Sequence, residues 1–308
     1  MRSIVTGGAG FIGSHLVDYL VSAGDDVIVI DSLISGDLNS IKSHLDEKRI
    51  TLVSADLLSD SWQEHLAGAD RVYHLAADPD VRESSVAPEK QLNNTIIATH
   101  RVLEAMRKAG VPEIVFTSTS TVYGEASVIP TPESYTPMEP VSVYGASKLA
   151  SEALISAYCH SFSMRSWIFR FANIIGARSG HGVITDFIRK LTTNPQELEI
   201  LGDGKQTKSY LEVRECIRAI MYVVSHTHDP VNTYNIGSED WISVTEIADI
   251  LCSEMKLSPK YHYTGGSRGW VGDVPKMQLD IKRLKALGYV PNITSKESVR
   301  IAVRAALE

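Results

Sequence analysis

Tyr144 and Lys148 are the residues whose types and spacing most directly suggest chemistry. They stand four positions apart in VYGASKLASEAL (143–154), a helical pattern, so both side chains share one helix face. A tyrosine hydroxyl titrates at about pH 10, too high for a base at neutral pH, but a neighbouring ammonium favours the phenolate. The pair predicts proton transfer at an alcohol, with Tyr144 as acid or base. The same spacing is common on ordinary surface helices, so the surrounding sequence has to decide.

A run of hydroxyl residues precedes this pair. Residues 117–121 read TSTST and directly follow the apolar segment EIVF at 113–116, with no acid or base among them. In open α/β sheets ligands bind at the carboxyl ends of strands, where this run would lie. Thr119 and Thr121 are therefore candidates for contacting a ligand. For Thr117 and Ser120 the simpler interpretation is backbone capping.

The first strand runs into a glycine-rich loop, TGGAGFIGSHL at 6–16. Gly7, Gly10 and Gly13 would permit a tight turn, let the backbone approach a pyrophosphate and let the next helix pack closely. The helix N-terminus then offers unpaired N–H groups to the phosphates. Asp31 ends the following apolar run VIVID, where an acid can bind an adenosine ribose and repel a 2′-phosphate. This context predicts a dinucleotide site that prefers NAD to NADP.

The elements that would position these residues follow a regular alternation. Apolar, β-branched runs predict strands, and helical patterns such as Ser14–Ala23 and Ile96–Lys108 lie between them. This alternation is typical of an α/β fold, a doubly wound parallel sheet covered on both faces. After about residue 173, Gly- and Pro-rich loops separate shorter elements, which predicts a smaller, less regular second domain. The expected strands cover 3–6, 26–30, 50–55, 71–76, 113–118 and 166–171.

Composition narrows the possible functions. The 308 residues are 44% hydrophobic and 22% charged, as in globular proteins with a substantial core, and the net charge of −7 argues against a nucleic-acid-binding surface. Three cysteines without paired spacing fit a reducing compartment and offer no zinc site, so we expect no metal. No signal-peptide pattern and no apolar run of membrane-spanning length occur. We therefore expect a cytoplasmic protein that does not act at a membrane.

Together, these motifs resemble the extended short-chain dehydrogenase/reductase family, in the nucleotide-sugar branch typified by the UDP-glucose 4-epimerases. The resemblance spans nearly the whole chain. It implies an NAD-binding Rossmann domain at 1–172, with a return segment at 211–239, and a nucleotide-sugar-binding α/β domain at 173–210 and 240–308. It also implies a homodimer formed through the helices that start near Ile96 and Tyr144.

The family pattern assigns cofactor contacts along the first half of the chain. The residues after the third strand would lie at the adenine, and HLAA (74–77) after the fourth strand would line the cofactor, with His74 itself more plausibly structural than a base. One position departs from the pattern, because Thr95 stands where the family usually has asparagine and Asn93 and Asn94 precede it. The implied cofactor-binding residues are Gly7, Gly10, Phe11, Ile12, Gly13, Asp31, Asp56, Leu57, Leu75, Ala76, Ala77, Ser118, Tyr144 and Lys148.

The same pattern nominates a substrate site. RFANIIG (170–176) resembles the segment whose asparagine contacts the diphosphate-sugar, and two later segments supply cations for the phosphates. Lys208 stands where arginine is common, which exchanges bidentate geometry for a point charge. The implied catalytic residues are Tyr144, Lys148 and Thr119, and the implied substrate-binding residues are Thr119, Thr121, Tyr144, Asn173, Lys208 and Arg268.

The hydroxyl run bears on the type of reaction. Dehydratases of this family carry Asp-Glu after the catalytic threonine, and the decarboxylases carry Ser-Glu. Here Thr119 is followed by Ser120 and Thr121, closest to the pattern of the 4-epimerases. The resemblance therefore implies an isomerase, an NAD-dependent 4-epimerase of a UDP-hexose that interconverts UDP-glucose and UDP-galactose through a 4-keto intermediate.

Three alternatives remain open from the sequence. The substrate can instead be a UDP-N-acetylhexosamine or UDP-glucuronate, because Met277, near the position that gates bulk at C2, is intermediate in size and flexible. The protein can be a nucleotide-sugar 4-keto reductase that consumes NAD(P)H. A non-catalytic NAD-binding protein is disfavoured, since such proteins commonly lose the Tyr or the Lys that this chain keeps.

Overall fold

The structure is a computed structural model, and it describes residues 1–308 apart from 79–80, 82–83, 85, 267 and 270–273. The chain folds into two compact units. Unit 1 comprises 1–122, 139–170 and 223–234, and unit 2 comprises 123–138, 171–222 and 235–308. The sequence-based division into 1–172 with 211–239, and 173–210 with 240–308, stays a prediction.

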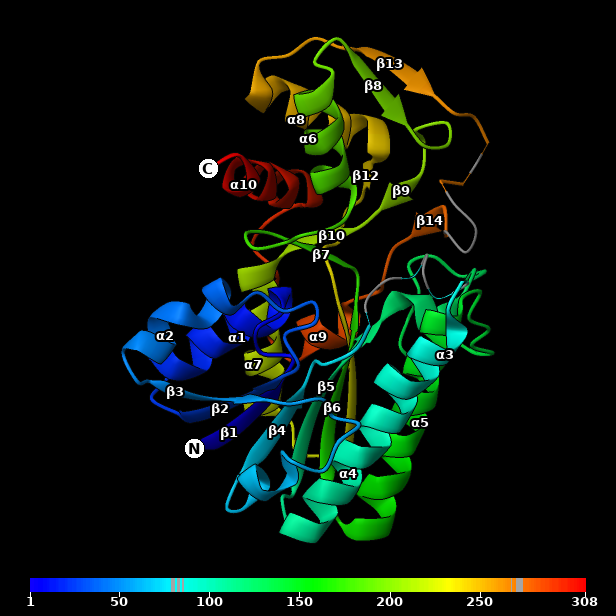
Figure 1. The fold of residues 1–308 in the computed structure, drawn as a ribbon. Helices are drawn as coiled ribbons and strands as arrows, with labels where there is room; N and C mark the ends of the chain where they lie inside the picture. The colour runs from blue at the N-terminus through cyan, green and yellow to red at the C-terminus, as the bar shows by residue number, and fades with distance from the viewer. Residues whose placement is uncertain (79–80, 82–83, 85, 267, 270–273) are drawn as a thin grey trace. The chain divides into compact units, whose positions relative to one another are not determined.

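A seven-stranded sheet organises the first unit (Figure 1). The strand order within the described residues is β11-β6-β5-β4-β1-β2-β3, and β1 pairs in parallel with both β2 and β4. The prediction of a doubly wound Rossmann-type sheet is confirmed. The strands are β1 (Arg2–Thr6), β2 (Asp26–Asp31), β3 (Ile50–Ser54), β4 (Arg71–His74), β5 (Glu113–Thr119), β6 (Arg165–Phe171) and β11 (Val231–Ile236).

The strand order reverses between β1 and β4. The chain steps from β1 to β2 in one direction along the sheet and from β4 to β5 in the other, and such crossovers are right-handed. Helices α1 (Phe11–Ser22) and α4 (Ala98–Ala109) therefore cover opposite faces. Helix α5 (Val143–Phe162) lies beside α4 (Figure 1). The reversal is the switch point at which open α/β sheets bind ligands.

The core of this unit is apolar on both faces of the sheet, as continuous apolar strands require. On the face that α4 covers, Ile4, Ile30 and Phe116 pack in one cluster with Leu103, all at most 1% exposed. The alternate strand residues Val5 and Val29 and Leu16 of α1 are also at most 1% exposed. Helix α4 does not start where the sequence pattern predicted. A short helix α3 (Pro88–Gln91) leads into a π-helical turn at Leu92–Ile97, and α4 continues from Ala98. The remaining short helix between β2 and β3 is α2 (Lys42–Asp46).

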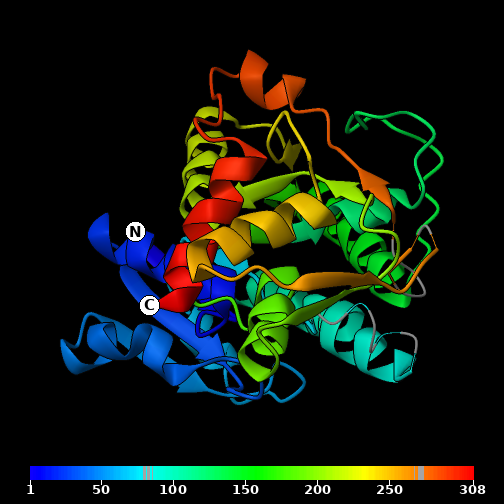
Figure 2. The same cartoon turned by 90° about the horizontal axis from the view of Figure 1, so that it is seen from above.

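The second unit is built from small sheets and helices. Its core packs α6 (Val183–Thr193), α8 (Val244–Met255) and α10 (Ser295–Leu307) around Phe187, Leu251 and Val303. Figure 2 shows α8 and α10 side by side. The short strands pair as β7 (Asn173–Ile175) with β10 (Tyr210–Glu212), β8 (Glu197–Ile200) with β13 (Lys260–Tyr263), and β9 (Thr207–Lys208) with β12 (Ile242–Ser243) and β14 (Lys276–Met277). Helices α7 (Val213–His226) and α9 (Lys282–Ala286) are the remaining α-helices of the described residues, and short 3-10 helices cover Leu38–Ile41, Gln63–Leu66 and Ser120–Tyr123.

Candidate active site

The glycine loop between β1 and α1 is packed too tightly to accept side chains. Gly7 has φ +72°, and a Cβ there would lie 2.7 Å from the backbone nitrogen of Ala76, just after β4. A Cβ on Gly13 would lie 2.0 Å from the carbonyl oxygen of Gly7. Gly10 caps α1 without a side-chain hydrogen bond, so the first N–H groups of the helix, including those of Phe11 and Ile12, have no side-chain cap. The loop thus presents backbone donors to an anion.

Asp31 connects the end of β2 to this loop. Its buried carboxylate accepts hydrogen bonds from the Ala9 N–H at 2.9 Å and from the Leu33 N–H at 2.8 Å. Each carboxylate oxygen retains a further lone pair for a ligand hydroxyl. Asp31 therefore has a structural role that the sequence did not reveal, in addition to the predicted ribose contact, which stays a prediction.

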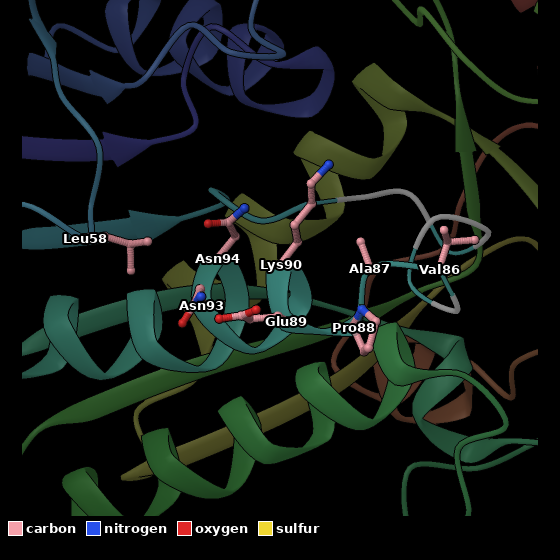
Figure 3. A pocket seen from close by; sticks show the side chains of 8 residues that line it. All are labelled: Leu58, Val86, Ala87, Pro88, Glu89, Lys90, Asn93 and Asn94. Carbon is pink, nitrogen blue, oxygen red and sulfur yellow. The ribbon is translucent and has the colours of Figure 1, made fainter.

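A cavity of about 470 Å³ lies beside the turn that follows β3 (Figure 3). Asp56 shapes this turn by accepting the Leu58 N–H at 2.8 Å, and Leu57 is buried in the core. In Figure 3 the side chains of Lys90 and Asn94 extend from the α3 and π-helical segment. The cavity is lined by Leu58, Val86, Ala87, Pro88, Glu89, Lys90, Asn93 and Asn94, none of which was predicted as a contact.

The cavity bears on Thr95, which stands where the family pattern usually has asparagine. The Thr95 side chain is 1% exposed and donates to Gln91 Oε1 at 3.4 Å inside the helix packing, so it has no open path to a ligand. Asn94, one position earlier, lines the cavity. An amide contact from this helix can thus come from Asn94. The doublet Asn93-Asn94 was the sequence signal for it.

His74 ends β4 and belongs to a continuous series of buried hydrogen bonds. Thr6 Oγ1 accepts the Ala76 N–H at 3.3 Å and donates its own proton to His74 Nδ1 at 2.7 Å. His74 Nε2 then donates to Thr99 Oγ1 at 3.1 Å, because Thr99 gives its proton to a backbone carbonyl at 2.6 Å. Burial and the charge on Lys148 lower the pKa of His74 to about 3. His74 is neutral and structural, and through Thr6 it holds the backbone at Ala76 in place, next to Leu75 and Ala77.

The hydroxyl run meets the start of α5. Ser142 caps the helix by accepting the Gly145 N–H at 3.1 Å, and a Cβ at Gly145 would lie 2.7 Å from the Thr121 carbonyl oxygen. Thr119 Oγ1 accepts hydrogen bonds from the Thr121 N–H and the Thr121 hydroxyl, both at 3.2 Å. The Thr119 proton is therefore directed to the Tyr144 oxygen, with which its side chain is hydrogen bonded. The three predicted residues Thr119, Thr121 and Tyr144 lie together.

The pKa values of Tyr144 and Lys148 both differ from the ordinary values of these side chains. Burial raises the pKa of Tyr144 to about 12, with the hydrogen bond from Thr119 lowering it and the charge of Asp78 raising it. Burial lowers the pKa of Lys148 to about 8, and the charge of Glu152 opposes that change. The Lys148 ammonium donates to the Thr117 carbonyl at 2.9 Å and lies 4.7 Å from the centre of the Phe116 ring. In the protein alone, burial thus disfavours the phenolate form of Tyr144.

Glu152 and Arg170 form a buried ion pair next to these residues. Arg170 Nη2 lies 2.6 Å from Glu152 Oε2, and both side chains are 7% exposed. Ser118 donates its hydroxyl to Glu152 Oε1 at 2.5 Å, so this predicted cofactor residue uses its side chain within the protein. Glu152 was not among the residues predicted from the sequence. Its position four residues after Lys148 on the same helix was the available signal.

The predicted diphosphate-sugar contacts belong to the second unit. Asn173 starts β7 and donates from its amide to the Ser209 carbonyl at 3.1 Å. Lys208 ends β9, opposite Ile242 of β12 and Met277 of β14. Arg268 forms an ion pair with Glu125 at 2.6 Å, and its side chain is 44% exposed. Their roles toward a substrate stay predictions.

Comparison with known proteins decides the family. The family model of the NAD dependent epimerase/dehydratase family matches residues 3–237. A putative UDP-glucose 4-epimerase of Methanocaldococcus jannaschii is 34% identical over 307 residues, covering 97% of this chain and 96% of that protein. This chain belongs to the NAD-dependent epimerase/dehydratase family. Its resemblance to the nucleotide-sugar branch of the extended short-chain dehydrogenases is thereby confirmed.

Solved structures and other relatives of the epimerase/dehydratase family agree. A crystal structure of a UDP-galactose 4-epimerase superposes with a TM-score of 0.90 and 41% identity, covering 100% of this chain and 99% of that one. A UDP-glucuronic acid 4-epimerase from Bacillus cereus, in complex with UDP-glucuronic acid and NAD, superposes with a TM-score of 0.90 at 28% identity, covering 99% and 98%. A UDP-glucuronic acid decarboxylase of Arabidopsis thaliana is 27% identical, covering 99% of this chain and 68% of that protein. The family thus includes more than one reaction.

The cofactor of the epimerase/dehydratase family is NAD, and the residues of this chain fit it. Gly7 and Gly13 leave space for backbone only, and the uncapped start of α1 offers N–H donors for a pyrophosphate. Asp31, with spare lone pairs, ends β2 beside that loop. For the residues that the structure describes, no group of three or more His, Cys, Asp or Glu side chains could hold a metal ion.

Proposed function

We propose that this protein is a 4-epimerase of a UDP-hexose that interconverts UDP-glucose and UDP-galactose. The observation that carries the proposal is the cluster of Tyr144, Thr119 and Thr121, in which hydroxyls occupy the positions after β5 where a carboxylate would serve elimination or decarboxylation. Inversion at C4 needs only hydride removal and return at one carbon, with one proton shuttle. The cluster supplies the proton shuttle.

The residues divide the work at the C4 alcohol. NAD, which the glycine loop and Asp31 would hold, would supply the acceptor and later the donor of the C4 hydride. Tyr144 takes the proton of the C4 hydroxyl as the hydride leaves, and the Thr119 hydroxyl turns its proton from Tyr144 to the C4 oxygen when substrate is bound. The 4-keto sugar then turns in the site, and Tyr144 returns the proton as hydride is added to the opposite face. No atom is gained or lost over the cycle.

Lys148 controls when this shuttle can operate. With a pKa of about 8, its ammonium is protonated at neutral pH, and a buried positive charge one helical turn from Tyr144 favours the phenolate. The positive charge of the oxidised nicotinamide acts in the same direction. These two charges would overcome the burial that holds the pKa of Tyr144 at about 12 in the protein alone.

The test is to follow UDP-glucose by ¹H NMR with purified enzyme while recording bulk NADH absorbance. An epimerase gives UDP-galactose with unchanged absorbance. A 4-keto reductase would consume NAD(P)H in proportion to product, and a decarboxylase would convert UDP-glucuronate to a UDP-pentose. Absence of C4 inversion for every UDP-hexose tested would end the proposal.

A second substrate series has specific support. A UDP-N-acetylglucosamine 4-epimerase from Methanobrevibacter ruminantium superposes with a TM-score of 0.90 at 26% identity, as does the UDP-glucuronic acid 4-epimerase at 28%. Met277, the residue nominated to gate C2, is half-buried on β14 opposite Lys208. Parallel rates on the glucose, N-acetylglucosamine and glucuronate forms would rank the three.

A further inference from the structure

Glu152 is placed where its charge acts on the catalytic helix. Tyr144, Lys148 and Glu152 follow one another at intervals of four on α5, so their side chains share one face. Glu152 is 6% exposed, and its carboxylate is held by Arg170 of β6 and Ser118 of β5. The carboxylate is thus fixed in position by two strands of the sheet.

A buried ion pair of this kind needs a reason beyond stability. Burying two charges costs more free energy than burying an apolar pair of similar volume, so buried ion pairs contribute little to the free energy of folding. The surroundings here would accept an apolar pair, since Ile155, Cys159 and Ile168 of the same core are 2% exposed or less. Ser118 adds a third polar group rather than closing an apolar contact.

The surroundings of Lys148 supply that reason. Its ammonium lies against the Phe116 ring and the Thr117 carbonyl, with neutral His74 on β4 and Tyr144 on the same helix. Of the charged groups that the structure describes as acting on it, Glu152 is the one that favours the protonated form. Arg170, the ion-pair partner of Glu152, is a cation, and any effect of its like charge on Lys148 would have the opposite sense.

We propose that Glu152 is a positioning residue of the active site, whose carboxylate, anchored by Arg170, keeps Lys148 charged and fixes Ser118 at the end of β5. Its effect on turnover rests on the proposed epimerase function. Its effect on the charge of Lys148 does not, so the two can fail separately.

The direct test is a ¹³C NMR titration of lysine Cε in the NAD-loaded protein, with the Lys148 signal assigned from its loss in Lys148→Arg. In Glu152→Gln the midpoint of Lys148 should fall by roughly one pH unit or more, because an opposite charge is removed and the positive charge of Arg170 is no longer offset by that carboxylate. In Arg170→Met the midpoint should not fall. A Glu152→Gln midpoint within a few tenths of wild type, or an equal fall in both variants, would overturn the proposal.

A second variant covers the case in which Glu152→Gln fails to fold. Glu152→Leu/Arg170→Met replaces the pair by apolar residues of similar volume, which buried pairs generally tolerate. The titration midpoint of Lys148 should also fall in this double variant, because Glu152, the nearer charge, is lost together with Arg170, the farther one. An unchanged midpoint in a folded double variant would contradict the proposal.

The pH profile of kcat then connects charge to turnover. The alkaline limb should move to lower pH in Glu152→Gln by the amount that the NMR midpoint moves. A purely structural role would lower kcat equally at all pH values. If the wild-type protein turns over no UDP-hexose, the proposed function fails, while the NMR titration still decides the role of Glu152.

Discussion

Replacing Gly7 by alanine should separate the close packing of the glycine loop from the ordinary cost of a left-handed backbone. Gly7 and Gly24 have similar dihedrals, with φ of +72° and +84°. An added Cβ at Gly7 would meet the backbone of Ala76 at 2.7 and 2.9 Å, whereas one at Gly24 would meet nothing within 4 Å. Gly24→Ala is therefore the matched control.

The magnitudes follow from these contacts. The left-handed conformation costs a residue with a Cβ roughly 1–2 kcal/mol, and this applies to both variants. Overpacking against backbone adds roughly 1–3 kcal/mol at Gly7 alone. We expect the free energy of unfolding to fall by about 2–5 kcal/mol in Gly7→Ala and by about 1–2 kcal/mol in Gly24→Ala.

The assay combines urea unfolding with calorimetric titration of NAD. Because Gly7 and Ala76 both belong to the predicted cofactor site, Gly7→Ala should also weaken NAD binding by roughly tenfold or more, and Gly24→Ala should leave it unchanged. Equal losses of stability in the two variants, together with unaltered NAD affinity, would refute the close approach of the loop to β4.

The remaining predictions concern the site, the pH dependence of activity and stability, and the oligomeric state. Tyr144→Phe should abolish C4 inversion while calorimetry still shows NAD binding, and retained turnover would remove Tyr144 from its role. With the Lys148 pKa at about 8, kcat should fall roughly tenfold per pH unit above pH 8, in a profile over pH 6–10. The pKa of Lys148 in the folded protein, about 8, lies below its usual value of 10.5, so between pH 8 and 10.5 the unfolded chain binds more protons than the folded protein. The contribution of Lys148 to the free energy of unfolding should therefore rise with pH over this range, in which activity falls. Urea unfolding at several pH values measures it. The homodimer expected through the helices near Ile96 and Tyr144 should give twice the 33.8 kDa chain mass in light scattering, and a monomer would contradict it.

Local pattern was sufficient to predict most of the first unit. The six predicted strands fall within one or two residues of β1 to β6, because buried parallel strands are continuous apolar runs that sequence alone displays. The helix expected at Ile96–Lys108 was approximately right, but the π-helical turn at Leu92–Ile97 was not foreseen. No local sequence propensity predicts that turn. In it, the Thr95 carbonyl accepts a hydrogen bond from the Thr99 hydroxyl.

The site was predictable where one segment carries the chemistry and not where distant segments meet. Tyr144 and Lys148 share a helix, so spacing alone placed them on one face. Glu152 shares that helix as well, but its significance depends on Ser118 and Arg170, from two different strands. The pKa of Tyr144 likewise depends on burial, which a local pattern of residues does not report.

Asp31 has a consequence for any attempt to exchange NAD for its phosphorylated form. Such a redesign would start by removing the acid at the end of β2, to admit a 2′-phosphate. In this protein the same carboxylate holds the N–H groups of Ala9 and Leu33. Removing the carboxylate would therefore also release the glycine loop, to which the new cofactor would have to bind. Asp31, the predicted determinant of coenzyme preference, thus also holds the glycine loop, and a successful swap must rebuild two backbone hydrogen bonds as well as add a cation.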